Sequence, residues 1–539
     1  MACARTVRTL TIVLCGLLVG IALAVTPPWA DSAATIPQRG GTLHFALGED
    51  PDTLDPHATI SLTSSNVQSL IYAPLVYIGQ DGLPGGLVAQ SWTISPDGKS
   101  LTFRLRPGLT FQDGTPVNAQ AVEFTFKRHM DPATAAPNRQ TLGPLTEVKA
   151  LDEMTVRFAM TQPYAPLFTN LAISSLTIVS PAAVQKQGKG FGHNPAGAGA
   201  GPFMFKSWTP GSEIVLVRNP GYKLGAFRAD TANKGVPYVD ELDLKVVPEV
   251  GTRIAALTTG ELDVSSLTLE AVPRFVNDPR FQVITKKDAN DLVFIEFNYK
   301  RPPFDDPKFR AALGWAIDKQ AIVTQAWGGY ATANPTPMPV GDAGYDPKIG
   351  QQYGIGYDPR KAAQMFDELG WKINPATKIR EKDGRPAKFA CWTYSGFETV
   401  KRGCEIIQAN LKDVGLDVGV QLTDFGTMSG QMPKAQFDFD LMRWTYADPT
   451  ILSLLFKTPG WVKLFSDSSL DAVLNQADTT LDPKRRVEYV KQAQVMILQK
   501  AIIIPILTDW LITGARAEVQ GLHLDHFGGL LYQDVWLKR

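Results

Sequence analysis

LVFIEFNYKRPPFDDPKFRAALGWAID, the stretch from Leu292 to Asp318, decides how this chain folds. It opens with an apolar run that predicts a buried strand over Leu292–Phe297, with a single carboxylate at Glu296. The strand cannot continue through Pro302-Pro303, because proline has no N–H to donate. Asp306 is predicted to cap a helix that has Pro307 at its first position. The helix then buries one side at helical spacing, through Phe309, Leu313, Trp315 and Ala316.

The length and composition of the chain limit the number of lobes and the class of protein to be expected. A chain of 539 residues exceeds what one hydrophobic core supports, so two or three lobes are expected. The chain is 44% hydrophobic and 20% charged with a formal net charge of +0, as in ordinary soluble globular proteins. Because no basic surplus exists, a nucleic-acid partner is not expected.

The first thirty residues read as a secretory signal peptide. Arg5 and Arg8 precede an apolar run over residues 10–25 that is followed by small residues. Cleavage could follow Ala24, Ala30 or Ala34, and the sequence does not choose among them. No later apolar run is long enough to cross a bilayer. The mature protein is therefore expected to be exported, and to be periplasmic.

A block of short motifs covers residues 40–126. Turn signals alternate with strand patterns, and Thr115-Pro116 is predicted to begin a helix that buries Val122, Phe124 and Phe126 in part. The motifs are GGTL (40–43), LDP (54–56), IYAPLV (71–76), SPDGK (95–99), FQDGTP (111–116) and AVEFTF (121–126). Further on, residues 388–394, 400–411 and 416–422 predict a βαβ unit with parallel strands.

These motifs, together with the stretch at 292–318, resemble the extracytoplasmic peptide-type solute-binding proteins of ABC importers, the family of the oligopeptide- and dipeptide-binding proteins. The resemblance covers nearly the whole mature chain. It implies an α/β, two-lobed periplasmic binding protein-like fold with mixed sheets, a hinge and an additional N-terminal subdomain. The implied boundaries are residues 1–30 for the signal peptide, 31–62 with 169–285 and 508–539 for lobe I, 63–168 for the extra subdomain, and 286–507 for lobe II.

No catalytic constellation is found in the sequence. HExxH, GxSxG and paired CxxC motifs are absent, and GAGAGP (197–202) precedes strand patterns where a dinucleotide site needs a helix. His523 and His526 are expected in an exposed turn rather than at a metal. We therefore expect no enzyme activity, no cofactor and no metal.

The ligand-binding candidates follow partly from the resemblance and partly from the aromatic residues on segments that the fold would direct to the cleft. The resemblance implies that residues 60–62 pair with an extended ligand and that Glu296 lies in the pocket. In peptide-binding relatives an aspartate after a Trp-rich loop holds the α-ammonium, but here the spacing from Trp444 to Asp448 is shorter, so that aspartate has no clear counterpart. The candidates are Ile60, Ser61, Leu62, Glu296, Trp392, Tyr394, Arg443, Trp444, Tyr446, Asp448 and Trp510.

Removal of the signal peptide leaves two cysteines, Cys391 and Cys404. In an oxidising compartment they could form one disulfide, or they could remain buried thiols where a strand packs on a helix. The sequence leaves both readings open.

The function predicted is that of a monomeric receptor that captures a peptide or peptide-like solute between two lobes. It would deliver the solute to inner-membrane permease subunits that work with a separate ATPase. One alternative within the class is an oligosaccharide or other polar non-peptide solute, which the aromatic residues favour. Alternatives from other classes are a secreted chaperone or a hydrolase, and the hydrolase lacks a nucleophile–base or metal cluster.

Overall fold

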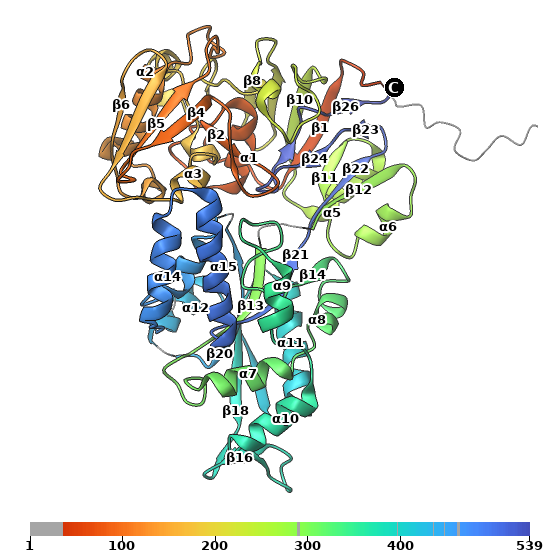
Figure 1. Ribbon diagram of the computed structural model, residues 1–539. Coiled ribbons are helices and arrows are strands. Elements are labelled where there is room, and N and C mark those ends of the chain that lie inside the picture. The colour runs from red at the N-terminus through yellow and green to blue at the C-terminus, as the bar shows by residue number, and fades with distance from the viewer. Residues whose placement is uncertain (1–35, 288–290, 396, 435, 447, 461–463) are drawn as a thin grey trace, which may run out of the picture. The chain divides into compact units, whose positions relative to one another are not determined.

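The structure is a computed structural model that describes residues 36–287, 291–395, 397–434, 436–446, 448–460 and 464–539. The predicted signal peptide lies outside the described residues. Two large mixed sheets and one smaller antiparallel sheet organise the chain from Gln38 onward (Figure 1). None of the helices within the described ranges is long and apolar enough to span a membrane.

A seven-stranded sheet contains the first and last long strands of the chain. Its central strand β1 pairs in parallel with β10 and β11. Strands β9 and β22 run antiparallel to these three, and the edge strands β8 and β12 pair antiparallel with β9 and β22. In spatial order the strands are β12 (Phe281–Lys286), β22 (Leu511–Arg516), β11 (Val264–Ser266), β1 (Thr42–Leu47), β10 (Glu241–Val246), β9 (Glu213–Arg218) and β8 (Phe203–Thr209). Around it lie α1 (Leu62–Ile71), α4 (Pro181–Gln187), α5 (Val250–Thr259) and α6 (Val272–Val276).

The motif block near the N-terminus forms a four-stranded antiparallel sheet with its own core. The strands are β4 (Ala89–Ile94), β5 (Ser100–Leu105), β7 (Thr155–Met160) and β6 (Leu145–Ala150), with α2 (Ala119–Met130) and α3 (Leu167–Asn170) beside them. The predicted helix start at Thr115 is wrong. Asn118 is the N-cap, since its side chain accepts from the Ala121 N–H, whereas Thr110 and Pro116 form an isolated antiparallel bridge.

The stretch that decides the fold lies at the centre of a six-stranded sheet. All seven residues of β13 (Asp291–Phe297) are buried, as in a strand covered on both faces. Burial of each large apolar side chain there contributes about 1.5–3 kcal/mol. The other strands, in spatial order around it, are β14 (Ala331–Ala333) and β21 (Ile504–Asp509) on one side and β20 (Phe439–Thr445), β18 (Lys388–Tyr394) and β19 (Asp417–Thr423) on the other.

The helix predicted after the proline pair is α7 (Pro307–Trp315). Asp306 caps it by accepting from the Lys308 N–H, and Phe309, Leu313 and Ala316 are buried as expected. Trp315 is only half-buried, and the Lys361 ammonium lies 3.5 Å from the centre of its ring. The predicted βαβ unit is confirmed, because β18 and β19 pair in parallel and α11 (Glu398–Asp413) connects them.

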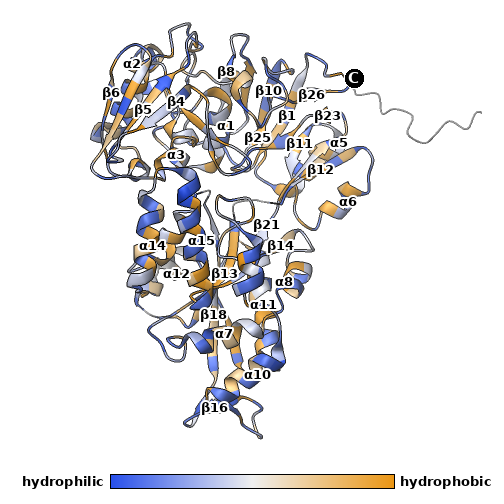
Figure 2. Ribbon diagram, in the orientation of Figure 1, coloured by the Kyte–Doolittle hydropathy of each residue, from blue (hydrophilic) through white to orange (hydrophobic). Residues whose placement is uncertain are grey.

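Helices cover both faces of the six-stranded sheet, and their apolar sides are visible as orange segments (Figures 1 and 2). One face packs against α7, α8 (Lys319–Gln325), α10 (Pro359–Glu368) and α11. The other packs against α12 (Phe425–Gln431), α13 (Ile451–Phe456), α14 (Ser468–Thr479) and α15 (Pro483–Gln499). The remaining helix, α9 (Pro347–Tyr353), contacts α15.

Small two- and three-stranded sheets complete the fold. They pair β2 (Val76–Ile78) with β3 (Pro84–Gly86), β23 (Val519–Gln520) with β26 (Trp536–Leu537), β24 (His523–Leu524) with β25 (Leu530–Leu531), and β15 (Lys372–Ile373) with β16 (Arg380–Lys382) and β17 (Arg385–Pro386).

The chain passes between the two large sheets at two places in its second half. It leaves the seven-stranded sheet at Lys286 and enters the six-stranded sheet at Asp291. It returns between Asp509, the last residue of β21, and Leu511, the first of β22. We call these two segments the crossovers. The predicted residue boundaries of the lobes stay a prediction.

Candidate functional site

The candidate site lies at the edge of the six-stranded sheet that adjoins the crossovers. Strands β18, β20 and β21 all end at this edge, and β13 begins there. In α/β folds, the space beyond the carboxyl ends of strands is where ligands usually bind.

An Arg between two aspartates is the main charged feature of this edge. Arg443 Nε lies 2.6 Å from Asp291 Oδ2, and Arg443 Nη2 lies 3.5 Å from Asp509 Oδ2. The pairing follows from register, because Val293 lies opposite both Arg443 on β20 and Leu507 on β21. Side chains alternate along a strand, so Asp291, Arg443 and Asp509 share one face of the sheet.

The electrostatics of this group are unbalanced, with two carboxylates facing one guanidinium. Burial, opposed by Arg443 and assisted by the nearby Asp509, raises the pKa of Asp291 to about 7. The pKa of Asp509 is also raised by burial, in spite of Arg443. The Arg443 and Asp509 side chains are 22% and 17% exposed, so solvent reaches this group.

One aromatic ring contacts the Arg443 guanidinium, and two other aromatic residues lie near the Arg443 backbone. The Arg443 guanidinium lies 4.9 Å from the centre of the Phe397 ring, and the Tyr394 hydroxyl donates to the Arg443 carbonyl oxygen at 3.3 Å. Trp444 is half-buried and follows Arg443 on the opposite face. Three of the predicted residues, Tyr394, Arg443 and Trp444, thus lie at this edge of the sheet, but the Trp444 side chain faces away from the Arg443 guanidinium.

Trp510 lies on the second crossover, next to Asp509. Its indole N–H donates to Thr332 Oγ1 at 2.8 Å, and the Lys287 ammonium lies 4.5 Å from the centre of its ring. Lys287 directly follows β12, so this cation–π contact joins the two crossovers.

Tyr446 and Asp448 belong to a different network. Asp448 accepts from both terminal nitrogens of Arg486, at 2.8 and 2.6 Å, and from Thr169 Oγ1 at 2.5 Å. Although burial opposes ionisation, Arg486 and these hydrogen bonds hold the pKa of Asp448 at about 2. Burial raises the pKa of Tyr446, and Asp448 adds to the effect. Asp448 therefore joins α3 to α15 through protein partners.

Glu296 and Trp392 lie further along the strands, away from the crossovers. Glu296 is 0% exposed and lies directly opposite Asp440 in the β13–β20 register. Trp392 adjoins Asp440 in the parallel β18–β20 pairing. A solute could reach the Glu296 carboxyl only if the residues covering it moved, so its role in binding stays a prediction.

The segment 60–62 stands apart from the other candidates. Ile60 and Leu62 are 74% and 75% exposed, whereas Ser61 caps α1 by accepting from the Ser64 N–H. Only residues 60 and 61 precede the helix, because Leu62 is its first residue. Strand-like pairing with a ligand is limited to that short piece.

Asp291, Asp509 and Phe397 were missed by sequence reasoning. Asp291 and Asp509 carried one usable signal, since each is a carboxylate at the end of an apolar strand pattern near a predicted crossover. Phe397 carried none, because only the fold shows that the residue preceding α11 lies over Arg443.

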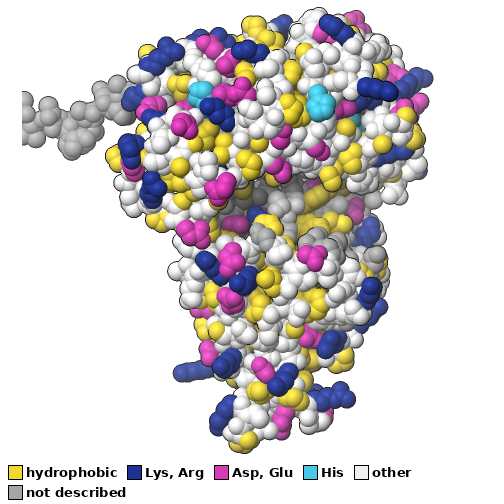
Figure 3. All heavy atoms as spheres, turned by 180° about the vertical axis from the view of Figure 1, so that it is seen from behind, with side chains coloured by type: hydrophobic (Ala, Val, Ile, Leu, Met, Phe, Trp, Pro, Cys, Tyr) yellow, Lys and Arg dark blue, Asp and Glu magenta, His cyan; other side chains and the backbone are white. Residues whose placement is uncertain are grey.

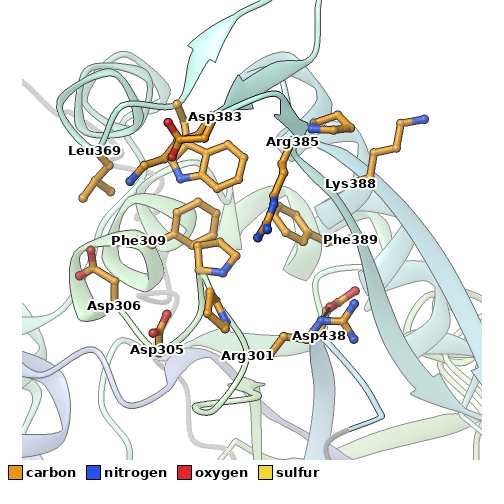
Figure 4. A pocket seen from close by; sticks show the side chains of 15 residues that line it. Arg301, Asp305, Asp306, Phe309, Leu369, Asp383, Arg385, Lys388, Phe389 and Asp438 are labelled. Atoms are coloured by element: carbon orange, nitrogen blue, oxygen red, sulfur yellow. Dashed lines mark ion pairs between the residues drawn. The ribbon is translucent and has the colours of Figure 1, made fainter.

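A separate pocket of about 650 Å³ lies between the loop after β13 and the hairpin of β16 and β17 (Figure 4). Phe309, Trp371 and Phe389 form its apolar wall, and Arg301 on its rim pairs with Asp438 at 2.8 Å. None of the predicted ligand-binding residues is among its lining residues.

Two other sequence expectations concern histidine and cysteine. His526 is 1% exposed, so the expectation of an exposed turn for it is wrong. The described ranges contain no cluster of three or more His, Cys, Asp or Glu side chains able to hold a metal. Cys391 and Cys404 are buried free thiols whose sulfurs are in contact.

Comparison with known proteins agrees with this architecture. The family described as "Bacterial extracellular solute-binding proteins, family 5 Middle" matches residues 84–461, more than half of the chain. The glutathione-binding protein GsiB of Escherichia coli K12 is 27% identical over 509 residues, which cover 92% of this chain and 94% of GsiB.

Solved structures show the same two-lobed fold. HbpA2 from Haemophilus parasuis superposes with a TM-score of 0.81 at 25% identity, covering 93% of this chain and all of HbpA2. The periplasmic binding protein DppA from Helicobacter pylori, solved with the peptide STSA, has a TM-score of 0.68 at 23% identity, covering 93% of this chain and 99% of DppA. The chain belongs to the family 5 extracellular solute-binding proteins, the peptide-type receptors of ABC importers, which bind solutes and are not enzymes.

Proposed function

We propose that this protein captures a peptide or peptide-like solute in the periplasm and delivers it to an ABC permease that works with a separate ATPase. The observation that carries the proposal is the group of Asp291, Arg443 and Asp509 at the crossovers, with the Phe397 ring beside it. Relatives named for glutathione and peptides support the same solute class. Figure 3 shows that this face of the molecule is hollowed, with acidic and basic side chains spread over the surface above and below the hollow.

The charge of the group favours a ligand that carries an ammonium. Two carboxylates beside one guanidinium leave an excess of negative charge, and both carboxyl pKa values are raised. A ligand ammonium at Asp509 would supply the missing positive charge. This gives the α-ammonium of a peptide the acidic partner that the loop after Trp444 does not clearly provide.

The position of the group suggests how binding is coupled to closure. Asp291 and Asp509 are the residues at which the chain enters and leaves the six-stranded sheet. A solute that contacts them and the other lobe together would bind the closed arrangement more tightly than the open one. Such differential affinity is what shifts a hinged protein toward closure.

An oligosaccharide or other polar non-peptide solute is the second candidate. Phe397 is exposed and Trp444 and Trp510 are half-buried, and their rings offer flat apolar faces that suit sugar rings. The acidic excess distinguishes the candidates, because a neutral sugar would leave it unbalanced.

Calorimetry and thermal shift on the mature protein test the proposal. The panel contains glutathione, di- and tetrapeptides, their N-acetyl forms and neutral oligosaccharides. A solute at a hundred times its Kd stabilises the folded state by about 2.7 kcal/mol. We expect stabilisation by free-amine peptides and much less by N-acetyl forms. Stabilisation by oligosaccharides alone would establish the second candidate, and saturation by none of the compounds, with binding of unfolded chains, would indicate a chaperone.

A further inference from the structure

Two carboxyl side chains lie next to each other on one face of the six-stranded sheet, away from Asp291, Arg443 and Asp509. Glu296 on β13 and Asp440 on β20 are directly opposite in the antiparallel register, so their side chains leave the same face. Both are 0% exposed. No side chain among the residues that the structure describes hydrogen-bonds to either carboxyl. The effect of burial on the pKa of Asp440 outweighs that of its one backbone contact, with Glu296.

The surroundings of this pair are apolar. Phe294 and Met442 are its neighbours on the same face, and the core there includes Met428 from α12 and Ile497 from α15. The free-energy cost of burying an ionised carboxylate in such a place is far larger than the free energy that one hydrogen bond contributes. A second carboxylate beside it adds electrostatic repulsion. The pair therefore needs a cation.

The charged and titratable groups nearby do not supply one. Tyr299 donates its hydroxyl to the Ile502 carbonyl oxygen at 2.9 Å, and Asp438 is held by Arg301 and by the Ala390 N–H. The Cys391 thiol, on the adjacent strand, faces Cys404. From the helix side, Lys500 at the end of α15 pairs with Asp467. No Lys, Arg or His within the described ranges forms an ion pair with Glu296 or Asp440.

We propose that Glu296 and Asp440 form a proton-binding pair that remains protonated in the folded protein at neutral pH. The pair takes its protons from solvent as the chain folds, and a carboxylic O–H of one residue donates to the carboxyl oxygen of the other. A proton is the one cation that this closely packed place accepts without a cavity. Burial raises the carboxyl pKa of both residues, which agrees with this arrangement.

The pair makes the fold sensitive to alkali. Carboxyls whose pKa is raised in the folded state stabilise it fully below their unfolded pKa, about 4, and the stabilisation is lost as pH rises toward the folded pKa. Gln and Asn imitate the protonated forms, so Glu296→Gln and Asp440→Asn should remove this loss. Glu261→Gln, at an exposed position, is the matched control.

Infrared difference spectroscopy tests the pair directly. At about pH 8.5, above the pKa of Asp291, the wild type should retain a carbonyl band of protonated carboxylic acid. Glu296→Gln and Asp440→Asn should each reduce or shift that band, whereas Glu261→Gln should not. The Tm of the double variant should fall less than that of the wild type between neutral pH and pH 10.

Two results would overturn the proposal. One is a wild-type spectrum without an acid carbonyl band, a measurement that does not depend on any variant folding. The other is a band, or a fall in Tm with pH, that neither substitution alters. Both results are independent of which solute the protein binds, so they are separable from failure of the proposed function.

Discussion

Arg443 and Asp291 form a 2.6 Å ion pair that joins the end of β20 to the residue at which the chain enters the six-stranded sheet. The same guanidinium reaches Asp509, where the chain leaves that sheet. One side chain thus connects both crossovers. A solute that interacts with this group acts at the two points about which a hinge motion would turn.

Replacement of the more exposed aspartate should separate amine recognition from general binding. We expect Asp509→Asn to lower the affinity for free-amine peptides at least tenfold, because a charge-assisted hydrogen bond contributes about 1.5–3 kcal/mol. N-acetyl peptides should bind this variant as they bind the wild type. Calorimetry gives both affinities, with the exposed Asp413→Asn as control. Equal losses for both peptide forms would count against an amine partner at Asp509.

Affinity for an amine should depend on pH through Asp291. An ammonium ligand favours the ionised carboxylate, and the pKa of Asp291 is about 7 in the folded protein. Affinity should therefore fall as pH drops from about 8 to 6, at most about tenfold per pH unit. Asp291→Asn should flatten the profile. Calorimetric titrations across this range measure both effects, and an unchanged profile in the variant would exclude Asp291 as the titrating group.

The buried ion pair of Asp448 and Arg486 should matter more for stability than an exposed pair. Asp448→Asn leaves the Arg486 charge buried without its partner, so we expect a loss of about 3–5 kcal/mol in the free energy of unfolding. Glu518→Gln breaks a more exposed pair with Arg516 and should cost less than about 1 kcal/mol. Urea unfolding followed by circular dichroism compares the two. Similar small losses would mean that Thr169 and Thr450 hold this network without the charge.

Two buried histidines should make the fold sensitive to acid. The His57 and His129 rings lie 5.3 Å apart, and burial lowers their pKa values to about 3 and about 4. Because the folded protein favours the neutral imidazoles, their contribution to stability is fully present above the unfolded pKa of about 6.5. Below that pH, each histidine lowers the free energy of unfolding by about 1.4 kcal/mol per pH unit. His129→Phe should reduce that loss, whereas the exposed His193→Gln should not. Measurements of Tm from pH 7 to pH 4 test this prediction. Parallel curves of Tm against pH for the wild type and His129→Phe would contradict it.

Oxidation should join the two thiols. The Cys391 and Cys404 sulfurs are 2.9 Å apart, between β18 and α11, and we expect a disulfide in protein isolated from the periplasm. Closing a loop of this length would stabilise the fold by about 3 kcal/mol. Mass spectrometry after alkylation under denaturing conditions should find neither thiol labelled until a reductant is added. Full labelling without reductant would show that they remain thiols.

The sequence by itself determined the elements whose causes are local. Asp306-Pro307 set the start of α7, the parallel pair β18–β19 followed from a βαβ pattern, and the motif block indicated the family. Thr115-Pro116 misled because that dipeptide also suits a turn, and the competing cap at Asn118 lies only three residues on.

Only the tertiary structure decided which charges meet. Arg443 contacts Asp291 from a strand far along the chain, and Asp440 faces Glu296 because β20 pairs with β13 in one particular register. A shift of one residue would turn every side chain of β20 to the opposite face and separate both pairs. That register is fixed by burial on the two sides of the sheet, a property of the whole packed structure that no short segment encodes.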